Sequence, residues 1–287
     1  MRKHEQLLES VSEAKTAYGE AVFWWMGQHS FILKLGERVV YIDPYLSPNP
    51  ARRTPPLLLP SETGHADLIL CTHDHTDHID PGSIPGIAKA ASNAVFVAPK
   101  TARQRMLDLG VDEKRLVSLD AEDVYEGDWV RVAAVKGKHE FFDHDPVLGY
   151  PYLGYVIEAN GAALYHAGDT IVYEGLVSTL QAWDFDAVFL PINGRDARRL
   201  KAGCLGNMTF QEAVDLAGDI STRWAVPTHY EMFEGNSADP QDFTDYLSAK
   251  YPQIRAWVGE AGEPVLIPSR NTQTKNKSKT ATKETRI

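Results

Sequence analysis

Short apolar runs separated by turn residues dominate the chain once its polar first segment ends. From Ala21 onward, Gly27 and Gly36 break three such runs, which read AVFWWM, FILKL and RVVYID. Apolar runs of this length between turn-forming residues are typical of β-strands. We therefore predict that the domain begins with strands joined by tight turns.

Later runs are apolar throughout and lie near helical stretches, which changes the predicted architecture. These runs read ADLILC, AVFVAP and VFLPI, and the helical stretches include SIPGIAKAAS and TARQRMLDLG. Strands that are covered on both faces have this continuous apolar pattern. Asn160-Gly161 predicts a hairpin turn, and Thr209 to Glu212 has the capping-box spacing that starts a helix. Together these signals predict α/β layering.

The two ends of the chain differ from its middle. Leu7, Leu8 and Val11 recur at helical spacing within residues 2 to about 18, which predicts an amphipathic surface helix. After Pro268 the sequence is polar, basic and free of aromatic residues, so it lacks the apolar surface that ordering requires. The predicted organisation is a surface helix at 1–20, one domain at 21–268 and a disordered basic tail at 269–287.

Composition narrows the functional classes. With 287 residues and 43% hydrophobic content the chain can bury one sizeable core, and its net charge of −10 argues against nucleic acid or an anionic membrane as the main partner. Cys71 and Cys204 form no C-x-x-C pair, and no run reaches the roughly 20 apolar residues of a membrane span. The N-terminus also lacks the apolar core of a signal peptide, so we expect a cytoplasmic protein with a small-molecule substrate.

The densest chemical signal lies directly after an apolar strand that ends at Cys71. The segment LILCTHDHTDHID places His73, His75, Asp77 and His78 within six residues. Imidazole and carboxylate ligands suit zinc, manganese or iron, whereas calcium prefers all-oxygen sites. A solvated loop with incidental histidines would not concentrate so many ligands. The spacing therefore predicts a metal site, with room for two adjacent ions.

The run HDHTDH resembles the H-x-H-x-D-H signature of the metallo-β-lactamase superfamily, and His139, Asp169 and His229 follow in the order that this family shows. The resemblance implies an α/β fold, the αββα sandwich in which two mixed β-sheets pack face to face with helices outside. It also implies seven metal ligands. One ion would bind to His73, His75 and His139 and the other to Asp77, His78 and His229, with Asp169 shared between them.

A closer resemblance runs from about Phe23 to Pro268. The segments that carry it are MGQHSF, EFFDHDPVLGYPYLGYVIEANG, PINGRDARR, CLGNMTFQEAVDLAG and PTHYEMF, which are similar to the bacterial L-ascorbate-6-phosphate lactonase family. The resemblance implies a cytoplasmic, manganese- or zinc-dependent lactonase of sugar-acid catabolism that forms a homo-oligomer. Iron stays open as a third metal, because these ligands accept several ions.

The expected chemistry is hydrolysis at a carbonyl, with Asp77 and Asp169 as the catalytic carboxylates. A water shared by two cations loses a proton near neutral pH, and the hydroxide attacks the lactone carbonyl that a cation polarises. Asp77 would orient this water or accept its proton. Either Asp77 or a metal-bound water would protonate the departing alkoxide.

Other polar residues near the signature are candidates for supporting roles. Asn193 and Arg195 belong to a basic cluster with Arg198, Arg199 and Lys201 that would clamp a phosphorylated, anionic substrate. We assign substrate contact to Asn193, Arg195 and His144. We expect His29, Asp43 and His166 to form hydrogen bonds that orient the metal ligands without binding the ions themselves.

Three alternatives remain at the level of sequence. A metal pair can also drive in-line attack on phosphorus, which would make the protein a phosphodiesterase for a small molecule or nucleotide. A mononuclear iron redox enzyme is the second alternative, although His75 stands where di-iron relatives carry glutamate. A non-catalytic metal-binding protein is the third, but it would be expected to lack a ligand or Asp77, and the sequence retains all of them.

Overall fold

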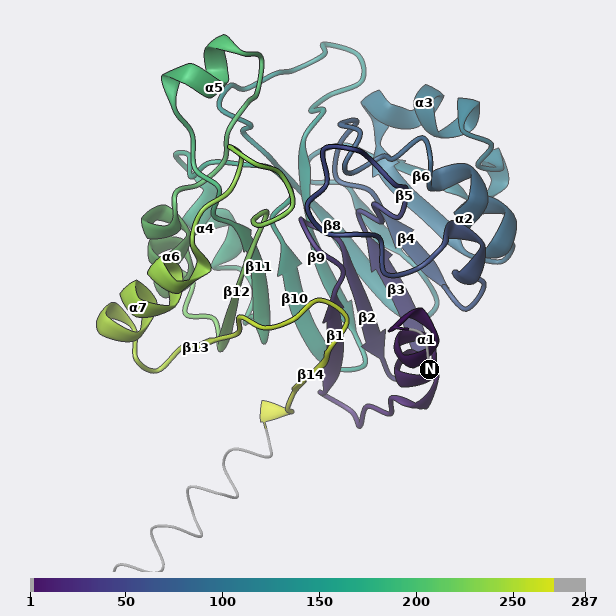
Figure 1. Cartoon of the computed structure of the whole chain (residues 1–287), viewed down its shortest axis with the longest axis horizontal. Helices are drawn as coiled ribbons and strands as arrows, with labels where there is room; N and C mark the ends of the chain where they lie inside the picture. Colours follow the sequence, from purple (N-terminus) through teal and green to yellow (C-terminus); the bar gives the residue numbers. More distant parts are fainter. Residues whose placement is uncertain (1–2, 271–287) are drawn as a thin grey trace, which may run out of the picture.

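Two seven-stranded β-sheets lie face to face in the computed structural model, which describes residues 3–270 (Figure 1). This arrangement confirms the predicted αββα sandwich. The first sheet has the strand order β14-β1-β2-β3-β4-β5-β6. Its strands are β14 (Pro264–Ile267), β1 (Ala21–Trp25), β2 (Phe31–Leu35), β3 (Arg38–Ile42), β4 (Leu68–Leu70), β5 (Val95–Pro99) and β6 (Leu116–Leu119).

The second sheet has the order β13-β12-β11-β10-β9-β8-β7. Its strands are β13 (Arg255–Ala256), β12 (Trp224–Thr228), β11 (Ala187–Pro191), β10 (Ala162–His166), β9 (Leu153–Ala159), β8 (Val130–Lys136) and β7 (Val124–Glu126). The two sheets share one pairing scheme. From β14 to β3 and from β7 to β10 neighbouring strands are antiparallel, and the remaining pairs in each sheet are parallel.

Both faces of the first sheet are buried, which explains its continuously apolar strands. Along β1, Phe23 and Trp25 pack into the core between the sheets, whereas Val22 and Trp24 belong to a second cluster under the helices. Successive side chains of a strand point to opposite faces, so a strand buried on both sides needs apolar residues at every position.

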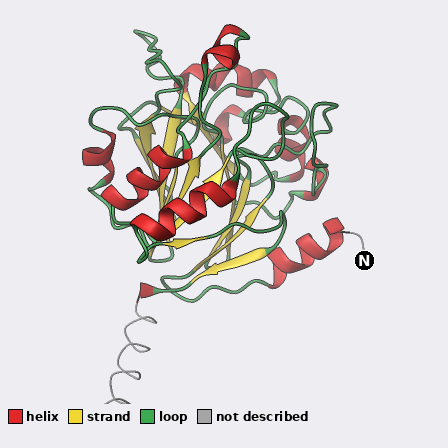
Figure 2. Ribbon diagram, turned by 60° about the vertical axis from the view of Figure 1, so that its left-hand side comes forward, coloured by secondary structure: helices red, strands yellow, loops and turns green. Residues whose placement is uncertain are grey.

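Helices cover the outer faces of both sheets (Figures 1 and 2). Those beside the first sheet are α1 (Lys3–Glu13), η1 (Pro60–Glu62), α2 (Ile84–Ala90), η2 (Lys100–Ala102), α3 (Arg103–Asp108) and η3 (Glu113–Arg115). In the half of the chain that forms the second sheet they are α4 (Leu176–Leu180), α5 (Ala197–Lys201), α6 (Phe210–Asp219) and α7 (Pro240–Lys250). No helix within residues 3–270 is long and apolar enough to cross a membrane.

Local signals in the sequence match local structure at two places. Asn160 and Gly161 both have positive φ between the antiparallel strands β9 and β10, as a type I′ turn requires. Thr209 accepts a hydrogen bond from the Glu212 backbone, and the Glu212 side chain accepts one from the Thr209 backbone. This reciprocal pair starts α6 as predicted.

The N-terminal helix is shorter than predicted, and most of the predicted C-terminal tail lies outside the described residues. The first helix ends at Glu13 instead of about residue 18, because Thr16 is engaged elsewhere. Its hydroxyl donates to the Gly36 carbonyl and accepts from the Gly36 amide, which fixes this segment to the β2–β3 turn. Residues 271–287 of the predicted disordered tail lie outside the described residues.

A single aromatic residue should control much of the stability of the core. Phe189 of β11 is fully buried and its ring contacts those of Phe23 and Phe31 at 5.4 and 4.6 Å. We expect Phe189→Ala to lower the free energy of unfolding by about 3 to 5 kcal/mol in a denaturant titration, because it leaves a cavity between the sheets. Phe141→Ala is the control, since Phe141 is 51% exposed. Equal effects of the two substitutions would contradict this view of the core.

Candidate metal centre

The predicted ligands come from four loops that each follow a strand. Four of them lie in the loop after β4, and His139, Asp169 and His229 follow β8, β10 and β12. The carboxyl ends of parallel strands meet at one edge of a sheet, which is where sites form in α/β proteins. Packing the two sheets face to face brings these loops together at one end of the sandwich.

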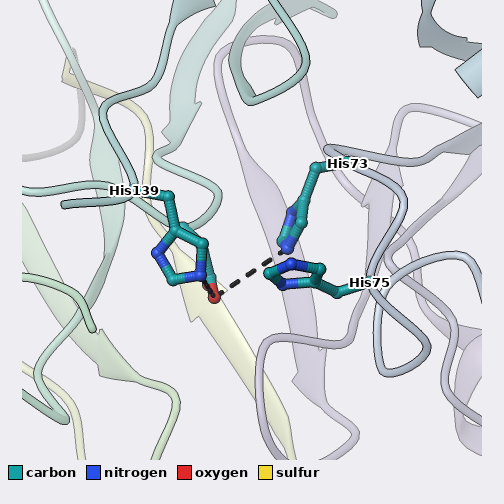
Figure 3. A group of neighbouring side chains, drawn as sticks. His73, His75 and His139 are labelled. Atoms are coloured by element: carbon teal, nitrogen blue, oxygen red, sulfur yellow. Dashed lines mark ion pairs between the residues drawn. The ribbon is translucent and has the colours of Figure 1, made fainter. Parts of the chain in front are cut away.

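Their donor atoms form two compact groups. Within each group, one ligand atom per residue lies within 4.8 Å of all the others. Figure 3 shows the rings of His73, His75 and His139 pointing toward one another. The first group contains His73, His75, His139 and Asp169, and the second contains Asp77, His78 and His229. The structure thus brings the predicted ligands together in two groups, with Asp169 in the first.

Asp169 faces both groups. Its Oδ2 lies 3.6 Å from His139 Nε2 in the first group and 3.3 Å from His229 Nε2 in the second. Its Oδ1 lies 3.6 Å from His78 Nε2. The side chain is only 3% exposed. A buried carboxylate in this position can bridge two cations.

Hydrogen bonds behind the rings fix which nitrogen faces the centre. His78 donates from Nδ1 to Asp43 Oδ2 at 2.7 Å, and His139 donates from Nδ1 to the Gly206 carbonyl at 2.9 Å. Asp43 also accepts from the Thr72 amide and hydroxyl at 2.7 Å each. With Nδ1 protonated, Nε2 keeps a lone pair for a metal ion.

Several buried polar atoms of these residues lack a hydrogen-bond partner, and this bears on whether the residues fit metal ions. Among the described residues, His73 Nε2, His78 Nε2 and Asp169 Oδ1 are buried and accept or donate no hydrogen bond. Buried polar groups are normally satisfied, so such a group needs an explanation. All three belong to the predicted ligands, His73 and Asp169 to the first group and His78 to the second. The donor set therefore fits divalent cations.

Burial and the carboxylates act in opposite directions on the histidine pKa values. Burial lowers the pKa of His73 well below its usual value, with a further decrease from His78. Burial also acts to lower the pKa of His78, but Asp169, Asp77 and Asp43 outweigh it and raise that pKa to about 10. Asp169 and Asp77 also outweigh burial at His229 and raise its pKa. His78 and His229 together therefore balance the charge of the buried carboxylates.

Backbone strain concentrates at the same place. Gln28, Asp43 and His229 have positive φ angles of 54°, 44° and 61°, which side-chain-bearing residues rarely adopt. Gly168, one residue before Asp169, has a φ of 60°, and a Cβ there would lie 2.4 Å from the Leu153 carbonyl oxygen. Strain of this kind persists where the surrounding structure enforces it, often at functional sites.

The remaining histidines and the predicted substrate residues occupy varied places. His29 donates to the Gly168 carbonyl at 2.9 Å, and His166 donates to the His29 carbonyl at 2.9 Å, so both support the Asp169 loop. His144 is exposed, and its ring lies 4.7 Å from that of Tyr150. Substrate contact by His144 stays a prediction.

Asn193 and Arg195 hold their own loop in place. Asn193 is buried and donates to Asn236 at 2.8 Å. Arg195 donates to both carboxylate oxygens of Glu212, at 2.6 and 2.7 Å. These contacts tie the loop after β11 to the start of α6 and to the segment after His229. Direct contact of Asn193 or Arg195 with a substrate stays a prediction.

The sequence did not single out two residues that the structure places at the centre. Gln28 donates from Nε2 to Asp77 Oδ2 at 3.0 Å. The ring of Tyr152 lies 5.2 Å from that of His139 and 5.3 Å from that of His73. Gln28 precedes His29, to which the sequence pattern assigns the supporting role in this turn. Tyr152 lies in an aromatic stretch that the sequence assigns to strands. The turn glycine before Gln28 was the available signal.

The fold and the two facing donor groups define a metal-binding protein of the metallo-β-lactamase fold, and comparisons with known proteins place it among metal-dependent hydrolases. A family model for the beta-lactamase superfamily domain matches residues 38–230. A UPF0173 metal-dependent hydrolase of Cupriavidus taiwanensis is 30% identical over 264 residues, which cover 83% of this chain and 84% of that protein. The chain belongs to the beta-lactamase superfamily and, within it, to the UPF0173 metal-dependent hydrolase family.

Solved structures support the fold. Igni18, a metallo hydrolase from Ignicoccus hospitalis, has a TM-score of 0.69 at 23% identity, covering 86% of this chain and 98% of that one. An isothiocyanate hydrolase from Delia radicum gut bacteria has a TM-score of 0.65 at 18% identity, covering 85% and 98%. At these identities the similarity establishes the fold alone.

Metal uptake should release protons at mildly alkaline pH. Because His78 is protonated below pH 10 in the metal-free protein, an ion that binds there must displace a proton. We expect affinity for divalent ions to rise with pH up to about 10. Calorimetry at pH 8 in buffers of different ionisation enthalpy would count about one proton or more per protein. Binding with no proton release would contradict this assignment.

Asp43 should influence metal affinity without being a ligand. Asp43→Asn weakens the acceptor of the His78 Nδ1–H, so we expect affinity for the second ion to fall about 10- to 100-fold in a metal titration. Asp67→Asn is the matched control, because Asp67 also accepts from a backbone amide, that of Val39, at 2.9 Å. An unchanged affinity in Asp43→Asn would show that this hydrogen bond does not tune the centre.

Proposed function

We propose that this protein hydrolyses a lactone, or a related carboxylic ester, of a small anionic sugar acid, with L-ascorbate 6-phosphate as the first candidate. The observation that carries the proposal is the position of Asp169, whose carboxylate lies between two groups of metal ligands. Two divalent ions bound there would supply a nucleophilic water at neutral pH and polarise the ester carbonyl. The residues around the ions must then position the substrate and transfer a proton from the attacking water to the leaving alkoxide.

Asp77 is the carboxylate best placed to accept and donate a proton during the reaction. It is 20% exposed, whereas Asp169 is 3% exposed. Burial acts to raise the pKa of Asp77, but His78 and His229 outweigh it and lower that pKa. Asp77 is therefore ionised at neutral pH and can accept a proton from the attacking water. It can return this proton to the alkoxide that leaves when the ring opens.

Partly exposed residues indicate the side from which a substrate approaches. His75, Asp77 and Tyr152 are the partly exposed members of the centre. The Tyr152 ring, next to the rings of His73, His75 and His139, offers a flat apolar face beside the ligands. A compact ring compound suits such a site better than a polymer does.

Support for an anionic substrate comes from local charge. The chain carries a net charge of −10, so attraction of an anion must come from bound cations and nearby basic side chains. Arg198 and Lys201 are exposed on α5, which lies at the same end of the sandwich as the ligand loops (Figure 1). The loop that carries them also supplies the Gly206 carbonyl to His139.

Turnover of L-ascorbate 6-phosphate by manganese- and zinc-loaded protein tests the proposal. We expect metal-dependent ring opening that falls at least about 100-fold in His75→Ala, because the first ion loses a ligand. His4→Ala is the control, since His4 contacts Glu62 on the surface at 2.9 Å. Homoserine lactones and bis(p-nitrophenyl) phosphate are the comparison substrates. Cleavage of the diester without any lactone turnover would replace the proposal with the phosphodiesterase alternative.

A further inference from the structure

Gln28 is held against the second group of ligands by its own backbone. It lies in the turn between β1 and β2 with a φ of 54° and is fully buried. Its carbonyl accepts from the Trp25 indole at 3.0 Å and from the His229 amide at 2.9 Å. The turn therefore fixes Gln28 to β1 and to the loop that carries a predicted metal ligand.

The end of the Gln28 side chain contacts two of the residues that would bind the second ion. Its Nε2 is 3.0 Å from Asp77 Oδ2. It also lies beside the His229 ring, 3.1 Å from Nε2 and 3.2 Å from Nδ1. The amide is therefore within reach of an ion held between Asp77 and His229.

The other end of the same amide has no partner. Gln28 Oε1 is buried and accepts no hydrogen bond from the described residues. A rotation of half a turn about the last side-chain bond exchanges the oxygen and the nitrogen of an amide. A divalent cation beside Asp77 and His229 repels an NH2 group and attracts a carbonyl oxygen. The cation therefore favours the orientation in which Oε1 faces it.

We propose that Gln28 is a fourth protein ligand of the second metal ion, which it binds through Oε1 together with Asp77, His78 and His229. Glutamine oxygen is a harder donor than imidazole, so this ligand shifts the preference of the second site toward manganese relative to a site of histidines alone. The inference rests on the two-ion centre of the proposed function, but it does not depend on which substrate is hydrolysed.

Two substitutions separate this role from a structural one. Gln28→Asn keeps an amide and suits the left-handed backbone, where Asn is enriched, but its side chain is one methylene shorter and cannot reach the ion. Gln28→Glu keeps the reach and supplies a charged oxygen. Gln104 offers the matched control, because it donates to Asp108 at 2.8 Å on the surface. Gln104→Asn and Gln104→Glu therefore make the same changes far from the centre.

The test is a Mn²⁺ titration of chelator-stripped protein, with free Mn²⁺ followed by electron paramagnetic resonance. We expect the wild type and both Gln104 variants to bind two ions. Gln28→Asn should bind the second ion about 10- to 100-fold more weakly with the first unchanged, and Gln28→Glu should bind it at least as tightly as the wild type. Thermal melts of the metal-free variants check that they are folded.

Three results would overturn the inference. One is unchanged binding of both ions by Gln28→Asn. Another is a loss of the second ion in Gln28→Glu equal to that in Gln28→Asn, which would show that the amide acts only as a donor to Asp77. The third is uptake of a single ion by the wild type. A failure to hydrolyse any lactone, with the titration as expected, would count against the proposed substrate alone.

Discussion

The arrangement of the whole chain depends on one buried carboxylate. Asp169 is nearly inaccessible and lies within 4.0 Å of ring nitrogens of His73, His78, His139 and His229. A buried charge is strongly unfavourable unless it is paired. In the metal-free protein, His229 and His78 supply that pairing, and divalent ions would supply it more completely. Both sheets must therefore bring their loops to the same end of the sandwich.

Holding these groups together requires backbone geometry that the residues would not adopt alone. Gln28, Asp43 and His229 all take positive φ angles, and each is fixed by a hydrogen bond to another loop. The Gln28 carbonyl accepts from the His229 amide, and Asp43 accepts from Thr72 and His78. The loops thus restrain one another, while the rigid sheets restrain their ends. A centre built in this way is preorganised, because little of it needs to move when an ion binds.

Much of this could be predicted from sequence, and the limits have physical causes. Strands buried on both faces and the histidines at 73–78 are local patterns, which predict α/β layering and a metal site. The αββα sandwich and the grouping of the ligands followed only from the resemblance to the superfamily. The contact of Gln28 with His229 joins residues 201 positions apart, and the pairing of Arg195 with Glu212 depends on how α6 docks. The end of α1 at Glu13 depends on a contact between Thr16 and Gly36. Such contacts are set by tertiary packing, which residue patterns do not encode.

The metal ligands account for the type of chemistry, whereas the choice of substrate depends on other parts of the protein. The ligand set determines that hydrolysis is metal-dependent, since any electrophile that reaches the ions is exposed to the same chemistry. We expect substrate choice to depend on loops that contact the ligands. Residues 139–152 carry His139 and Tyr152, and residues 192–208 supply the Gly206 carbonyl to His139. The second of these loops is tied down by Arg195 and Asn193, so its shape is fixed before a substrate arrives. A fold shared at 18% identity with an isothiocyanate hydrolase therefore leaves the substrate open, because the same sheets can carry different loops around the ligands.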